Sequence, residues 1–241
     1  MSKKKSNKAT NKLEPLNKKQ EQLIAAILHN DMVVTEGSAG TGKTYIVTTM
    51  AAEGLKDGTY KRIIFTRPVI PCGKSIGFLP GTLEEKMAAW TLPFMAIIKQ
   101  HFSQGEIDMF IKNEKIAAIP FEVMRGSSFD DSFIIMDEAQ NCSKHEMKMF
   151  LTRIGEYSKT LILGDSTQSD LHYEGENGLE MVKRMIYEQG LNVPVVTFKA
   201  ADIVRSGICK EWVLAFEKEG SAFRDQKELP DFITKPVTQS S

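Results

Sequence analysis

A single stretch of eight residues combines glycines, a lysine and a threonine at the spacing that phosphate binding requires. Residues 37–44 read Gly-Ser-Ala-Gly-Thr-Gly-Lys-Thr and match the pattern G-x-x-x-x-G-K-[ST] at every position. Glycines let such a loop bring its N–H groups close to an anion, Lys43 can reach the β- and γ-phosphates, and the Thr44 hydroxyl can hold Mg²⁺. The stretch therefore predicts a nucleoside triphosphate site. The residues expected to line it are Gly37, Ser38, Ala39, Gly40, Thr41, Gly42, Lys43 and Thr44.

An acidic pair further along the chain supplies groups that a phosphate loop lacks. Asp137 and Glu138 directly follow the apolar run 133–136. Asp137 can hold Mg²⁺ directly or through a water molecule. Glu138 can orient and deprotonate an attacking water molecule. Such a pair can also be a solvated turn, but the phosphate loop in the same chain favours the catalytic interpretation.

A third polar motif, Gly-Asp-Ser-Thr-Gln at residues 164–168, follows another apolar run. Its Gln168 amide could sense the γ-phosphate and pass the presence of that group to a bound polymer. As a bare turn the sequence would be ordinary. Its expected place beside the phosphate loop favours a functional role.

The order of apolar and polar segments predicts the elements that must position these residues. Short β-rich runs alternate with helical stretches, which predicts an α/β protein with an open, mostly parallel sheet and helices on both faces. Because the carboxyl ends of parallel strands share one edge, the motifs that follow the strands should converge on one crevice. The expected strands are 32–36, 62–66, 133–137, 160–163 and 194–198, and the expected helices are 19–29, 43–56, 83–101, 144–153, 177–187 and 210–218.

Composition indicates an ordinary globular protein. Hydrophobic residues make up 41% and charged residues 26% of the 241 residues, with no net charge. The charge is uneven, because residues 1–19 hold seven lysines and one glutamate. Such an arm can touch nucleic acid or can be a solubilising disordered tail. Three scattered cysteines predict a reducing, cytoplasmic setting. No apolar run approaches the ~20 residues of a membrane helix, so we expect no membrane partner.

Taken together, the motifs resemble the PhoH family of P-loop ATPases, relatives of the superfamily-one helicase motor domain. The likeness runs from about residue 16 to residue 218 and implies a RecA-like core. It also implies Mg²⁺-dependent ATP hydrolysis coupled to a single-stranded nucleic acid, RNA before DNA. The motifs that carry it are 37–44, 66–68, 77–81, 124–126, 137–141, 147–155 and 164–168. The expected organisation is a basic tail at 1–15, one ATPase domain at 16–223 with an insertion at 69–120, and a flexible tail at 224–241.

The resemblance implies roles for further residues. Gln20 matches a family glutamine that recognises adenine, the alternative being a polar residue on an amphipathic helix. Arg205 matches an arginine that could face a γ-phosphate, the alternative being a surface ion pair. The expected nucleic-acid contacts are Thr66, Arg67 and Arg125.

The length of the chain bears on which residue would supply the positive charge that stabilises the transition state. A monomeric superfamily-one helicase uses two RecA-like domains, and this chain has room for one such core. An arginine finger is worth ~10³–10⁵ in kcat, so a cation must come from Arg205 or Arg67 in cis or from a neighbouring subunit. We expect a neighbour in a homo-oligomeric ring, possibly a hexamer, because head-to-tail interfaces close into rings.

Two other functions compete with a nucleic-acid-coupled ATPase. A P-loop kinase acting on a small molecule or a polypeptide would need an arginine-dense lid, which the sequence does not display. A nucleotide-gated binding module would have little use for a base at Glu138. Both remain alternatives that ATP hydrolysis assays distinguish.

Overall fold

The computed structural model describes residues 13–68, 83–121, 124, 126, 128–165, 177–205 and 207–224. These residues form two compact units, one that ends at Val204 and one that begins at Arg205. The first unit is an α/β sheet protein, and the second contains helix α7 (Gly207–Arg224). Among the described residues, we find no helix that is both long and apolar enough to cross a membrane.

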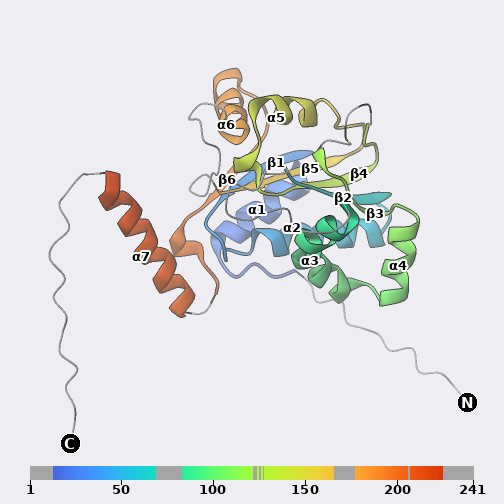
Figure 1. Ribbon diagram of the computed structural model, residues 1–241, viewed down its shortest axis with the longest axis horizontal. Helices are drawn as coiled ribbons and strands as arrows, with labels where there is room; N and C mark the ends of the chain where they lie inside the picture. The colour runs from blue at the N-terminus through green and yellow to red at the C-terminus, as the bar shows by residue number, and fades with distance from the viewer. Residues whose placement is uncertain are drawn as a thin grey trace, which may run out of the picture. The chain divides into compact units, whose positions relative to one another are not determined.

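A six-stranded parallel sheet forms the centre of the first unit (Figure 1). The strand order is β3-β2-β4-β5-β1-β6, so β5 lies between the strand that leads into the phosphate loop and the strand that precedes the acidic pair. Every pairing is parallel, and the open parallel α/β fold predicted from the sequence is confirmed. The strands are β1 (Met32–Gly37), β2 (Arg62–Thr66), β3 (Ile116–Ala118), β4 (Ser132–Met136), β5 (Lys159–Gly164) and β6 (Val195–Phe198).

Side chains of each buried strand alternate between two apolar clusters, one on each face of the sheet. Since both faces are apolar, helices cover both of them. On β1, for example, Val33 belongs to one cluster and Val34 to the other. Helices α1 to α4 pack on the first cluster and α5 and α6 on the second (Figure 1). The helices are α1 (Lys18–His29), α2 (Lys43–Lys56), α3 (Leu83–His101), α4 (Gln104–Lys112), α5 (Lys144–Leu151) and α6 (Gly178–Gln189).

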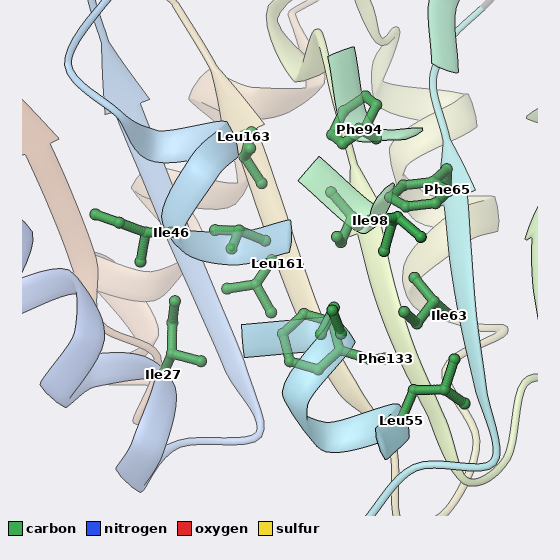
Figure 2. Packing of buried hydrophobic residues seen from close by; sticks show 14 of the residues in the cluster. Ile27, Ile46, Leu55, Ile63, Phe65, Phe94, Ile98, Phe133, Leu161 and Leu163 are labelled. Atoms are coloured by element: carbon green, nitrogen blue, oxygen red, sulfur yellow. The ribbon is translucent and has the colours of Figure 1, made fainter. Parts of the chain in front are cut away.

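The segment expected as an insertion at 69–120 contributes to the sheet and to the core. Its strand β3 pairs with β2, and its helix α3 buries Phe94 and Ile98 against Phe65 of β2 (Figure 2). Phe94 is therefore part of the core. Sequence reasoning found α3 with its observed bounds but missed both β3 and α4. Residues 69–82 lie outside the described part of the chain.

The turn from β1 into the phosphate loop requires glycine. Gly37 adopts a φ of 126°, a conformation that residues with a side chain avoid. A Cβ placed there would lie 2.1 Å from the backbone oxygen of Phe198 on β6. A side chain at this position would therefore have to displace the backbone of the edge strand.

Candidate nucleotide-binding site

A pocket opens at the carboxyl ends of β1, β4 and β5. The phosphate loop, the acidic pair and the start of the 164–168 motif all contribute to its wall, as the strand-end argument predicted. The Lys43 ammonium, the Thr44 hydroxyl and the two carboxylates of the pair therefore share one cavity. Its lining consists of Gly37, Ala39, Lys43, Thr44, Asp137, Glu138, Gln140, Leu163, Gly164 and Asp165.

Lys43 is held against the loop that contains it. Its Nζ donates hydrogen bonds to the carbonyl oxygens of Gly37 and Ser38, the latter at 3.0 Å. Burial lowers the pKa of this ammonium, and the nearby carboxylates of Asp165 and Asp137 oppose that effect. A lysine charge that faces two acids across a pocket is suited to hold an anion together with a divalent cation.

Asp137 is positioned by the backbone of the neighbouring strand, because its N–H donates to the carbonyl oxygen of Thr66 at 2.9 Å. Burial, and then the charge of Glu138, raise the pKa of Asp137 to about 6. The positive charges of Arg67 and Lys43 act in the opposite direction. Two acids close together in an enclosed site repel each other, so binding of a cation between them would stabilise their charged forms.

Glu138 is fixed by a side chain that sequence reasoning did not assign. Its backbone is left-handed, with φ 55°. Gln140, 1% exposed, donates from Nε2 to Glu138 Oε2 at 2.6 Å and accepts at Oε1 from the backbone N–H of Asp165 at 2.9 Å. Gln140 thus connects the second acid of the pair to the end of β5. Its position two residues after Glu138 was the available signal, but a single sequence does not reveal that the amide turns back toward that carboxylate.

The other predicted site residues lie in different surroundings. Thr66 is fully buried, and its hydroxyl donates to Met124 Sδ at 3.7 Å, so its side chain is not at the surface. The Arg67 guanidinium lies 5.8 Å from the centroid of the Trp90 ring. Arg205 begins the second compact unit. Arg125 and Gln168 lie outside the described residues.

Gln20 is not among the residues that line the pocket, and its side chain contacts the backbone of the phosphate loop. Its Nε2 donates to the carbonyl oxygen of Thr41 at 2.9 Å, and its Oε1 accepts from the backbone N–H of Leu16 at 2.8 Å. In this structure the amide therefore contacts the loop. The expected contact with adenine remains untested.

The strand order, the phosphate loop and the pocket define a P-loop NTPase with a RecA-like core. A family model described as PhoH-like protein matches residues 12–217. The chain belongs to the PhoH-like protein family, which confirms the resemblance seen in its motifs.

Curated relatives and solved structures show how far the likeness extends. The chain is 37% identical over 201 residues to a PhoH-like protein of Bacillus subtilis, covering 83% of this chain and 62% of that protein. It is 36% identical over 203 residues to protein PhoH of Escherichia coli, covering 83% and 57%. The chain thus spans about three fifths of these relatives. A crystal structure of Pif1 helicase from Candida albicans matches 78% of this chain and 41% of that one, at 19% identity and a TM-score of 0.39.

The oxygen donors of Thr44 and Asp137 line the same pocket and are of the kind that Mg²⁺ prefers. Since the pKa of Asp137 is about 6, its carboxyl is charged above that pH and neutral below it. Protons and metal compete for the same oxygens. We therefore expect the apparent Mg²⁺ affinity of the protein–nucleotide complex to fall by about tenfold per pH unit on the acid side of this pKa.

Calorimetric titration of Mg²⁺ between pH 5 and pH 8 measures this dependence. Nucleotide phosphates titrate near pH ~6 as well, so the Asp137→Asn variant is the necessary control. In that variant, the part of the pH dependence of Mg²⁺ affinity that comes from Asp137 should disappear. An identical pH dependence in the two proteins would exclude Asp137 from the metal site.

Proposed function

We propose that the protein binds ATP with Mg²⁺ in this pocket, hydrolyses the γ-phosphate and couples turnover to a single-stranded nucleic acid. The observation that carries the proposal is the shared cavity of Lys43, Thr44, Asp137 and Glu138. These four groups are those that phosphoryl transfer to water requires: a phosphate-binding cation, two metal ligands and a base. A reducing, cytoplasmic setting is part of the proposal and agrees with the buried free thiol of Cys142.

The residues of the pocket divide the chemistry among them. When bound, Mg²⁺ would neutralise charge on the β- and γ-phosphates. Lys43 would exchange its contacts with the loop carbonyls for phosphate oxygens, since its ammonium is already at the loop. Glu138 would orient a water molecule for attack and accept its proton, while Gln140 keeps the carboxylate in place.

A single-stranded nucleic acid, RNA before DNA, is the proposed partner. The proposal rests on the family resemblance, on the lysine-rich segment 1–19 and on Arg67, whose positive charge acts on Asp137. Arg125 and Gln168 complete the proposed polymer-contacting and γ-phosphate-sensing set. Since the chain spans about three fifths of its relatives, the activity of the whole protein is part of the proposal.

Substitution of Glu138 tests the assigned base. Glu138→Gln keeps an oxygen that can accept from Gln140 Nε2 but removes the proton acceptor. We expect ATP binding within twofold of wild type and phosphate release slowed by roughly 10²-fold or more. Binding is measured by calorimetry and turnover by a phosphate-release assay.

Glu114 offers a matched control for this substitution. It is also a left-handed glutamate, with φ 54°, and it is exposed on the turn after α4. Glu114→Gln should leave both binding and turnover unchanged. Phosphate release by Glu138→Gln within threefold of wild type would remove Glu138 from the role of base.

Polymer coupling is tested by phosphate release with and without a single-stranded RNA or DNA oligonucleotide. We expect the RNA to accelerate release severalfold, with the Glu138→Gln variant reporting any contaminating ATPase. Stimulation should weaken as salt rises, because phosphate contacts release counterions. No stimulation by either polymer would contradict the coupling. Transfer of the γ-phosphate to an added small molecule or polypeptide would instead indicate a kinase.

A homo-oligomeric ring is the proposed assembly, because efficient turnover needs a cation at the transition state. A neighbouring subunit would supply it, the alternatives being Arg205, Arg67 or another arginine in cis. Light scattering at micromolar protein with ATP and Mg²⁺ should show a species several times the mass of the chain. Full activity of a preparation that contains monomer alone would contradict the ring.

A further inference from the structure

Two segments from opposite ends of the first compact unit donate hydrogen bonds to carbonyl oxygens of the phosphate loop. Gln20, at the start of α1, donates to the carbonyl oxygen of Thr41 at 2.9 Å. The backbone N–H of Val204 donates to the carbonyl oxygen of Gly40 at 3.1 Å. The two segments are also joined directly, since Asn17 Nδ2 donates to the carbonyl oxygen of Asp202 at 3.0 Å.

These bonds determine which way the loop peptides face. A trans peptide is planar, so its carbonyl and the N–H of the following residue point in opposite directions. Because the carbonyls of Gly40 and Thr41 face Val204 and Gln20, the N–H groups of Thr41 and Gly42 point away from these two segments. A phosphate loop binds its anion through N–H groups of this kind. The hydrogen bonds from Gln20 and Val204 thus restrain the orientation of two peptides of the phosphate loop.

Both ends of the Gln20 amide already form hydrogen bonds with backbone groups. The side chain is 3% exposed, and its Oε1 already accepts from the N–H of Leu16. A Cβ added to Gly42 would lie only 2.6 Å from Gln20 Nε2, so the amide packs directly against the loop backbone. Because the side chain is buried, recognition of a base edge by Gln20 would require the amide to become accessible.

We propose that Gln20 is a positioning residue of the phosphate loop and contributes to triphosphate binding without regard to the base. The inference rests on the proposed nucleotide-binding function and assigns Gln20 a different role from the adenine contact that the family resemblance implied. Its distinguishing consequence is that loss of the amide weakens a ligand with no base as much as it weakens ATP.

The experiment compares three Mg²⁺-containing ligands, which are ATP, GTP and inorganic tripolyphosphate. Gln20→Glu keeps the acceptor for Leu16 and removes the donor to Thr41, whereas Gln20→Met removes both and keeps the volume. The controls are Gln22→Glu and Gln22→Met, because Gln22 is exposed on the same helix. We expect both Gln20 variants to raise Kd by about tenfold for all three ligands, since one buried hydrogen bond of the loop is lost. The Gln22 variants should remain within twofold of wild type.

Thermal melting first confirms that each variant is folded at the titration temperature, and Gln20→Met carries the test if Gln20→Glu does not melt cooperatively. A Kd raised for ATP alone would overturn the inference and support an adenine contact. Gln20 variants that bind all three ligands as the Gln22 controls do would also overturn it. Failure of the wild-type protein to bind any of the three would instead refute the proposed function, so the two failures are distinguishable.

Discussion

Parallel pairing of β1, β5 and β4 is the constraint on which the site depends. Glu36 of β1 pairs with Gly164 of β5, and Met136 of β4 pairs with Ile162 of the same strand. This register brings the ends of the three strands to one edge, so the phosphate loop and the acidic pair face each other although about a hundred residues separate them. The apolar faces of these strands stabilise the register, since a slip of one residue would send every side chain to the opposite face.

On this edge, polar groups are arranged by hydrogen bonds that cross between strands. Asp137 is held by the Thr66 carbonyl, and Gln140 connects Glu138 with the N–H of Asp165. Neither connection lies within one element. The geometry of the acids thus follows from neighbouring strands, which gives both carboxylates a rigid support.

Sequence reasoning succeeded where the signal was local. The phosphate loop has a fixed spacing, α2 follows it at once, and the apolar run before Asp137 defines β4. It missed β3, because Ile116–Ala118 has only three residues and no alternation of polar and apolar side chains. It also missed α4, although Ser103 and Glu106 form a capping box that was readable in the sequence.

The orientations of two glutamines were beyond what sequence could show. Gln140 follows the acidic pair, and Gln20 lies seventeen residues before the loop, but neither spacing says which backbone groups an amide will meet. Those partners belong to distant segments, namely Asp165 and Thr41. Roles of this type depend on tertiary contacts. In contrast, the burial of Met147 and Phe94 agrees with the apolar character of their side chains, which can be read from the sequence.

The close approach of Gly37 to Phe198 also bears on the order in which parts of the chain can fold during synthesis. The first residue of the loop is shaped against a strand that emerges 161 positions later, and the contact is with backbone, which cannot rotate aside. A ribosome-bound chain that has not yet exposed β6 would leave β1 as an open edge. The start of the phosphate loop should consequently reach its final backbone environment late in synthesis, only after the edge strand has paired.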